Sequence, residues 1–373
     1  MKSSRRQFLA TGLALPAVSL AQEPTASVLR YQKLGRTGLT PTRVAFGCMI
    51  TSDGSVIEKA ADLGINYFDT ARGYQGGNNE RMVGAALKAK RKQVYISSKT
   101  HAASKTRALE DLETSLRTLG TDYLDIWYQH GVSRAEELTS EVLEAHESAK
   151  KDGKVRFTGV STHMGQAAVI DAAIQCGKID VVLLAYNFTM DASLDPAVEK
   201  ARSAGIGLVA MKVMAGGFRK VDPGNKFYST LKRDGALAAA LRWVLKNPKI
   251  DTTIPSMTDM DQLEENLKAM SSKFTEADQS ILSAYLERIG PLYCRMCGKC
   301  EGTCSKGLPV ADVLRFLTYA DGYGQFALGR ERFLELPQEV TSVRCRECSC
   351  CSVHCANGVR VAKRLSRAQE IFS

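Results

Sequence analysis

Short runs of β-branched and apolar residues alternate with amphipathic helical stretches through most of the chain, from Arg30 to about Gly290. Such alternation is typical of a parallel sheet whose strands are joined by right-handed helical crossovers. The pattern predicts strands at residues 43–47, 66–70, 93–99, 123–129, 155–161, 181–185, 207–213 and 252–255. It predicts helices between them at residues 81–89, 106–119, 135–151, 167–176, 196–204, 236–247 and 261–270.

Eight strand–helix units within about 250 residues favour a (β/α)8 TIM barrel. We therefore expect such a barrel over residues 29–290. A doubly wound open sheet is the alternative fold. It is disfavoured because no Gly-x-Gly-x-x-Gly follows the first predicted strand.

Four chemically distinct side chains lie at or just after the ends of three successive predicted strands. They are Asp69, Tyr74, Lys99 and His130. In a barrel these strand ends form one mouth, so the four side chains can converge there. We expect the Lys99 ammonium to lower the pKa of the Tyr74 phenol, Asp69 to hold Lys99, and His130 to orient a substrate oxygen. Such a set would protonate a carbonyl while a hydride arrives from a nicotinamide.

The segments around these residues resemble the aldo-keto reductase family. Each of the four residues alone has a structural explanation, such as a helix cap or a packed aromatic, but the resemblance fills all four catalytic positions in order. It implies a (β/α)8 barrel and the reversible reduction of aldehydes and ketones with NADPH or NADH. It covers residues 29–290 and is carried by residues 34–39 (LGRTGL), 69–74 (DTARGY), 128–131 (YQHG), 153–161 (GKVRFTGVS), 254–256 (IPS) and 263–266 (LEEN).

The resemblance is looser on the side of the nicotinamide cofactor. It implies that Ser161 holds the carboxamide, with Thr162 in place of the usual partner, and that Leu183 replaces a family glutamine. Ser256 and Gln262 stand where well-known members carry cations for the adenosine phosphate, so the resemblance leaves NADP and NAD both open. Glu265 and Asn266 match the pair that contacts adenine. Lys212 and Arg219 are candidate sources of charge, and an ion pair in the barrel mouth is the alternative for Lys212.

Two cysteine runs of identical spacing mark the C-terminal part of the chain. The spacing Cys-x2-Cys-x2-Cys-x3-Cys is that of bacterial ferredoxins, in which the fourth cysteine of each run ligates the other cluster. It therefore predicts two 4Fe-4S clusters, one held by Cys294, Cys297, Cys300 and Cys355 and the other by Cys345, Cys348, Cys351 and Cys304. Zinc and disulfides are the alternatives. Cys350 is an extra cysteine, and no proline follows either run.

The segment between the two cysteine runs, residues 309–337, has helical periodicity. We therefore expect residues 291–373 to form a small, mainly helical, ferredoxin-like iron–sulfur domain. Tyr319 and Tyr323 within it are more typical of core packing than of electron transfer.

The N-terminus, residues 1–21, is typical of a twin-arginine signal peptide, with Arg5 and Arg6 before a short apolar stretch and Ser19-Leu20-Ala21 at the cleavage point. The apolar stretch is too short and interrupted for a stable membrane span. We thus expect the twin-arginine machinery to export the folded, cofactor-loaded protein to the periplasm or another extracytoplasmic location. The net charge of +10 is concentrated in this segment and at the C-terminus, which argues against a nucleic-acid partner.

The sequence thus predicts an exported oxidoreductase that interconverts a small carbonyl compound and an alcohol, with clusters that exchange electrons with an outside redox partner. A second interpretation is an electron-transfer protein whose barrel only binds a nucleotide or a partner. A third is an enzyme in which the clusters merely stabilise the C-terminal domain. Because free NAD(P)H is scarce outside the cytoplasm, we also expect a tightly held nucleotide.

Overall fold

The computed structural model describes residues 29–190, 192–218 and 235–373. Eight parallel strands pair in the order of the sequence. Backbone bridges from Val44 to Thr253 and from Gly47 to Ser256 join the last strand to the first, so the sheet closes into a barrel. The strands are β1 (Phe46–Gly47), β2 (Tyr67–Asp69), β3 (Tyr95–Thr100), β4 (Leu124–Gln129), β5 (Val155–Thr162), β6 (Val181–Ala185), β7 (Gly207–Met211) and β8 (Thr252–Thr253). The predicted barrel is confirmed, and the doubly wound alternative is excluded.

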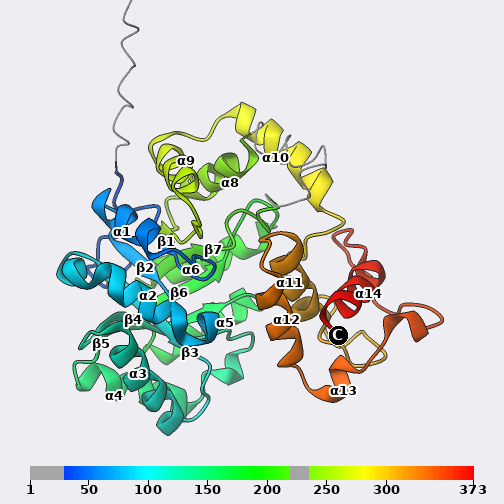
Figure 1. Ribbon diagram of the computed structural model, residues 1–373, viewed down its shortest axis with the longest axis horizontal. Helices are drawn as coiled ribbons and strands as arrows, with labels where there is room; N and C mark the ends of the chain where they lie inside the picture. Colours follow the sequence, from blue (N-terminus) through cyan, green and yellow to red (C-terminus); the bar gives the residue numbers. More distant parts are fainter. Residues whose placement is uncertain (1–28, 191, 219–234) are drawn as a thin grey trace, which may run out of the picture.

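Helices surround the barrel in the places that the sequence pattern predicted, with two additions (Figure 1). Neither α1 (Gly54–Asp62) nor α10 (Glu276–Ile289) was expected. The predicted helix at 135–151 is interrupted, because Thr139 accepts a hydrogen bond from the backbone of Val142 and starts a new helix. The others are α2 (Asn78–Leu87), α3 (Lys105–Leu119), α4 (Ser140–Lys151), α5 (Gln166–Cys176), α6 (Asp195–Ser203), α8 (Ala236–Leu245) and α9 (Met260–Ser271).

Side chains on the strands divide into two buried layers, as the period of a strand requires. One layer fills the barrel interior and includes Tyr67, Tyr128, Val181, Leu183 and Val209. The other layer lies between the strands and the helices. The polar groups of the barrel interior gather toward the carboxyl ends of β2 and β3, where Asp69 and Lys99 are both almost fully buried. The apolar layers therefore leave one end of the barrel for chemistry.

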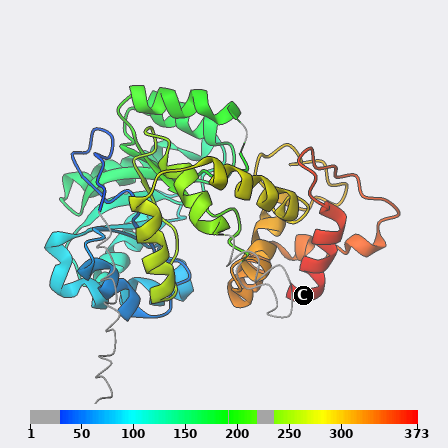
Figure 2. The ribbon, with the colours of Figure 1, turned by 90° about the horizontal axis from the view of Figure 1, so that it is seen from above.

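The C-terminal module, residues 291–373, packs beside this end of the barrel (Figures 1 and 2). It contains α11 (Val310–Asp321), α12 (Phe326–Leu334), α13 (Gln338–Thr341) and α14 (Val361–Phe372). The helical expectation for 309–337 is confirmed, and the apolar face of α11, from Val310 to Leu317, is buried against Phe333 and Phe372. The module comes very close to the barrel at Gly322, where a Cβ atom would lie 2.2 Å from the carbonyl oxygen of Gly216. Only glycine fits there.

The twin-arginine segment and Arg219 lie outside the described residues. Within the described ranges, no helix is both long and apolar enough to cross a membrane.

Candidate active site

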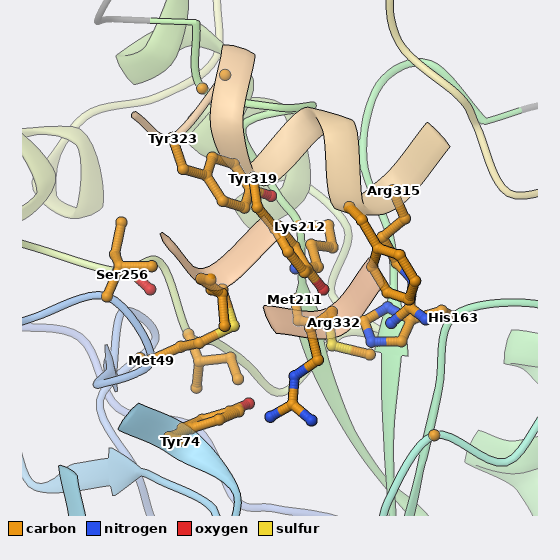
Figure 3. A pocket seen from close by; sticks show the side chains of 18 of the residues that line it. Met49, Tyr74, His163, Met211, Lys212, Ser256, Arg315, Tyr319, Tyr323 and Arg332 are labelled. Atoms are coloured by element: carbon orange, nitrogen blue, oxygen red, sulfur yellow. The ribbon is translucent and has the colours of Figure 1, made fainter. Parts of the chain in front are cut away.

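A cavity of about 590 Å³ opens at the carboxyl ends of the strands and is lined by both parts of the chain. The barrel contributes Asp69, Tyr74, His130 and Lys212, and α11 and α12 of the module form the facing wall. Figure 3 shows Arg315 and Tyr319 of α11, Tyr323 just after that helix, and Arg332 of α12 turned toward the same space as Tyr74. The mouth of the barrel is thus closed on one side by the C-terminal module.

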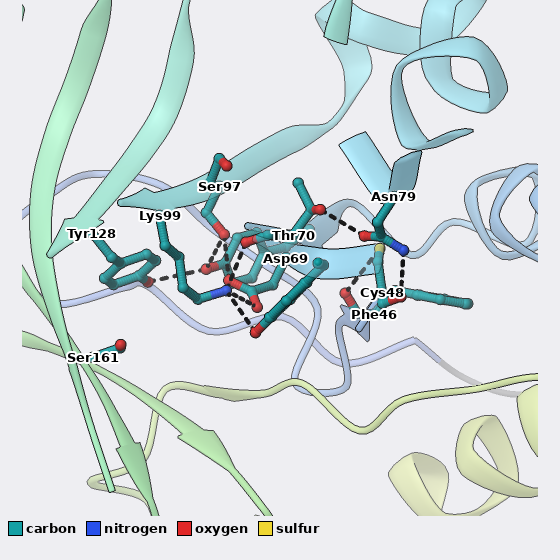
Figure 4. A network of polar contacts seen from close by, with 12 residues as sticks. Phe46, Cys48, Asp69, Thr70, Asn79, Ser97, Lys99, Tyr128 and Ser161 are labelled. Carbon is teal, nitrogen blue, oxygen red and sulfur yellow. Dashed lines mark hydrogen bonds and ion pairs between the residues drawn. The ribbon is translucent and has the colours of Figure 1, made fainter. Parts of the chain in front are cut away.

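Lys99 is the centre of a buried polar network beneath this cavity (Figure 4). Its ammonium donates to Asp69 Oδ2 at 2.5 Å, to the carbonyl of Thr70 at 2.7 Å and to the Tyr74 hydroxyl at 3.4 Å. Asp69 also accepts from the Ser97 hydroxyl at 2.7 Å. The carboxylate is therefore fixed on both oxygens, and it orients the amine toward the phenol. The structure thus brings together three of the four predicted catalytic residues by direct contact.

His130 completes the set from the end of β4. Its ring lies edge-on to that of Tyr74, with 5.9 Å between centroids, and it stacks on His101 at 4.1 Å. Burial, with His101 and Lys99 nearby, lowers the pKa of His130 well below its ordinary value, so the imidazole is neutral. Its Nδ1 atom has no partner among the described residues. A neutral imidazole can donate one hydrogen bond without bringing a charge into the cavity.

The expected lowering of the Tyr74 pKa by Lys99 is wrong. Burial, followed by the nearby Asp69 carboxylate, raises the pKa of Tyr74 well above its ordinary value. Burial also lowers the pKa of the Lys99 amine, which Asp69 opposes. The sequence revealed the neighbours of the phenol, but not how little water reaches it. In the structure Tyr74 is therefore a protonated acid.

Ser161 and Thr162, which were predicted to contact the carboxamide of the nicotinamide, do not line the cavity. Ser161 is buried and its Oγ accepts from the backbone of Gly131 at 2.9 Å, while the Thr162 hydroxyl donates to the carbonyl of Met164. The next residue, His163, does line the cavity, and its Nδ1 atom has no partner in the described part of the chain. Sequence reasoning missed His163, although it directly follows the matched motif.

The predicted adenosine side of the site is at the start of α9. Ser256 and Gln262 line the cavity. Gln262 is held by Thr258 and by Asp259, the residue that caps the helix. Glu265 lies one residue before Asn266, which is 1% exposed and whose amide oxygen and nitrogen both lack a partner among the described residues. An unsatisfied buried amide is costly, and an adenine edge offers what it lacks, so this part of the site fits a dinucleotide.

Among the described residues, Lys212 has no partner for the ion pair considered as its alternative. Its backbone has the left-handed value φ 58°, which ends β7 at Met211, earlier than expected. Its ammonium lies 4.7 Å from the ring centroid of Tyr319, on α11, and 5.2 Å from that of Tyr323, just after this helix. These two tyrosines are packed, as expected, but they also line the cavity.

The two cysteine runs lie side by side and their thiols form two groups. Burial raises the pKa of Cys294 to about 12, and the nearby thiols of Cys297, Cys300 and Cys355 contribute. Burial likewise raises the pKa of Cys345 to about 11, with contributions from Cys304, Cys348 and Cys351. The runs are tied together by the Ser352 hydroxyl, which donates to the carbonyl of Thr303 at 2.8 Å. Each group thus takes its fourth thiol from the other run.

All eleven cysteine thiols are free. Within the described residues, no three His, Cys, Asp or Glu side chains are placed to share a single metal ion.

The fold and the cavity are those of an NAD(P)H-dependent oxidoreductase, and comparison with known proteins agrees. Residues 52–287 match the model of the aldo/keto reductase family. The chain therefore belongs to that family.

Among its relatives, the chain is 26% identical to L-galactose dehydrogenase of Arabidopsis thaliana, over 68% of this chain and 92% of that protein. It is 25% identical to the NADH-specific methylglyoxal reductase of Escherichia coli, over 69% of this chain and 98% of that protein. The solved holo form of aldo-keto reductase AKR11C1 from Bacillus halodurans matches with a TM-score of 0.59, at 25% identity, over 69% of this chain and 96% of that one. The family match ends at residue 287, before the C-terminal module begins.

Proposed function

We propose that this enzyme interconverts a small carbonyl compound and the corresponding alcohol, with Tyr74 as general acid and base. The observation that carries the proposal is the contact of the Lys99 ammonium with both Asp69 and the Tyr74 hydroxyl at the floor of the cavity. When bound, a reduced nicotinamide supplies the hydride that the carbonyl carbon accepts.

The chain's own residues move the proton. The Tyr74 phenol, kept protonated by burial, donates its proton to the carbonyl oxygen as negative charge develops there. Lys99, at 3.4 Å, then stabilises the phenolate that remains. Neutral His130 donates a hydrogen bond that orients the substrate oxygen. In the reverse direction the phenolate takes the proton of the alcohol.

The start of α9 favours NADH over NADPH as the nucleotide. The Asp259 side chain accepts from the backbone of Gln262, so a carboxylate already occupies the helix N-terminus that would otherwise attract a phosphate. No Lys or Arg stands at Ser256 or Gln262 to offset this charge. The NADH specificity in the name of the Escherichia coli relative supports the same preference. Asn266, with Glu265 beside it, would hold the adenine.

We further propose that the C-terminal module carries two 4Fe-4S clusters. The grouping of Cys294 with Cys297, Cys300 and Cys355, and of Cys345 with Cys304, Cys348 and Cys351, supports this assignment. Thiols that gather in fours suit the corners of a cube. The clusters, when bound, provide one-electron carriers for an outside redox partner, and their thiolates tie the module together.

The twin-arginine segment supports export of the loaded protein to the periplasm or another extracytoplasmic location. Free NAD(P)H is scarce outside the cytoplasm, so the bound nucleotide has to stay on the protein rather than exchange with nucleotide in solution. Heat-denatured, purified protein should therefore release NAD(H), detectable by mass spectrometry, and an absence of nicotinamide would contradict a retained cofactor.

The reductase proposal is tested by nicotinamide oxidation with a panel of aldehydes. Replacement Tyr74→Phe removes the acid and should lower kcat/KM by about two to four orders of magnitude. Tyr31→Phe, at an exposed tyrosine, is the matched control. If Tyr74→Phe reduces aldehydes as fast as the control, the catalytic assignment fails, and the nucleotide-binding electron-transfer protein becomes the better interpretation.

A further inference from the structure

Lys212 brings a positive charge to the cavity wall that no carboxylate of the described residues neutralises. The other cations at the cavity are paired, as Lys99–Asp69, Arg315–Asp312 and Arg332–Glu335. A half-buried ammonium without a counterion loses hydration, and the rings of Tyr319 and Tyr323 offset only part of that loss. Lys212 is therefore the position in the cavity where an added negative charge is most stabilised.

The backbone holds Lys212 in place for this role. Its φ of 58° is uncommon for a residue with a side chain and costs about 1 kcal/mol. The side-chain amide of Asn187 donates to the Lys212 carbonyl at 3.0 Å. Strain of this kind is typical of functional positions, where surrounding contacts impose it.

A tyrosine and an arginine of α11 extend the positive site. The positive charges of Lys212 and Arg315 both act on Tyr319, whose ring centroid lies 4.7 Å from the Lys212 ammonium. Burial alone would raise the pKa of Tyr319, but these two charges more than offset it, so the pKa lies below its ordinary value. The lowered pKa reports a field that favours an anion at this point. Figure 3 shows the three side chains together on the cavity wall above Tyr74.

We propose that Lys212, Arg315 and Tyr319 bind an anionic group of the substrate, so that the enzyme reduces carbonyl compounds that carry a carboxylate or a phosphate. The inference rests on the proposed function, because it places the reacting carbonyl at Tyr74. It gives the C-terminal module a direct part in substrate choice, since two of the three residues belong to α11. The pyrophosphate of the nucleotide is also an anion that these residues could bind. The experiment therefore has to distinguish the pyrophosphate from an anionic group of the substrate.

The first arm compares charged and neutral aldehydes. Succinic semialdehyde and 4-carboxybenzaldehyde are each paired with their methyl ester, and the ratio of kcat/KM for acid over ester is measured. Replacements Lys212→Gln and Arg315→Gln should each lower this ratio by about tenfold or more, the worth of a charge-assisted hydrogen bond. Lys212→Arg, which keeps the charge, should restore most of it. Arg330→Gln, at an exposed arginine of α12, is the matched control and should leave the ratio unchanged.

The second arm measures the Kd of NADH for the same variants by fluorescence. If the anion is a group of the substrate, the Kd of NADH changes far less than the acid-to-ester ratio. A ratio that stays constant while the Kd of NADH rises by about tenfold would overturn the proposal and assign the positive site to the pyrophosphate.

The third arm does not depend on turnover. Terephthalate carries carboxylates but no aldehyde that a hydride can reduce. It is titrated calorimetrically into the wild-type protein, the two variants and the Arg330→Gln control, each with saturating NAD+. Weaker binding of terephthalate to the two variants than to the control supports the anion site. This holds even if the enzyme reduces no aldehyde of the panel, a result that would count against the reductase proposal but not against the anion site. Equal binding by all four proteins overturns the anion site.

Discussion

The guanidinium of Arg332 donates a hydrogen bond to the backbone carbonyl of Gly73 at 2.8 Å, although the two residues are 259 positions apart. A helix of the C-terminal module thus holds the residue that directly precedes the catalytic Tyr74. The same guanidinium pairs with Glu335 on its own helix, which fixes its direction. The side chain of Arg332 therefore connects the module to the loop that carries the acid of the active site.

Arg332 acts as a positioning residue for Tyr74. Its positive charge favours the phenolate and so opposes the rise of the Tyr74 pKa. Replacement Arg332→Gln should raise that pKa further, and the ascending limb of the pH profile for alcohol oxidation, which needs the phenolate, should move to higher pH. We expect kcat to fall several-fold with little change in the Kd of NADH, and Arg332→Lys to restore part of the rate. An unshifted pH profile in Arg332→Gln would contradict this role.

The crossing of the two cysteine groups predicts which cysteines matter for iron. Purified protein should contain about eight iron and eight sulfide ions per chain. Replacement Cys355→Ser should remove about half of the iron, from the group of Cys294, while Cys350→Ser should leave the content unchanged because Cys350 belongs to neither group. Colorimetric iron assay and electron paramagnetic resonance measure the outcome. Equal iron in both variants would contradict the assignment.

We expect the carboxylate of Asp259 to favour NADH over NADPH. Replacement Asp259→Ser keeps a good helix cap but removes the carboxylate, so it should lower the Kd of NADPH several-fold and change that of NADH little. Asp53→Ser is a close control, because Asp53 caps α1 in the same way. Both Kd values follow from fluorescence titration. No gain for NADPH in Asp259→Ser would show that this carboxylate does not set the preference.

We expect the buried imidazole of His146 to make the folded protein less stable in acid. Burial lowers the pKa of this imidazole from 6.5 to about 4. Between these values the unfolded chain binds a proton that the folded protein does not. The free energy of unfolding therefore falls as the pH drops below about 6.5, by about 3 kcal/mol in total, and this contribution levels off below about pH 4.

Removal of the imidazole should remove that pH dependence. Both ring nitrogens of His146 lack a partner among the described residues, and the ring packs on Trp127. Replacement His146→Leu should therefore give a flatter dependence of stability on pH, and a protein at least as stable at pH 5, as urea denaturation can show. The exposed His354→Leu should behave as wild type. A steeper acid loss in His146→Leu would contradict this account.

The barrel could be predicted from the sequence because each strand and helix is an independent repeat of one local pattern. The errors lie where a local feature is decided by something distant or subtle. β7 ends at Met211 because Lys212 is left-handed, and the short α1 buries only Val56, Ile57 and Ala60. Neither feature has a strong signal in a pattern of apolar spacing.

The active site could be predicted only in part, for the same reason. Asp69, Tyr74, Lys99 and His130 follow from their positions at successive strand ends, since the barrel brings such ends together. Arg315 and Arg332 could not be foreseen, because nothing local indicates that two helices between cysteine runs cover the mouth of a barrel. The pKa of Tyr74 was mispredicted because the sequence lists charges but does not give burial.

The exchange of the fourth thiol between the two cysteine runs has a consequence for the order of synthesis. The group of Cys294 needs Cys355, and the group of Cys304 needs Cys345, Cys348 and Cys351. Neither set of four exists until both runs have been synthesised. Assembly of the proposed clusters therefore has to follow synthesis of the second run, because a chain that stops between the runs has no complete ligand set.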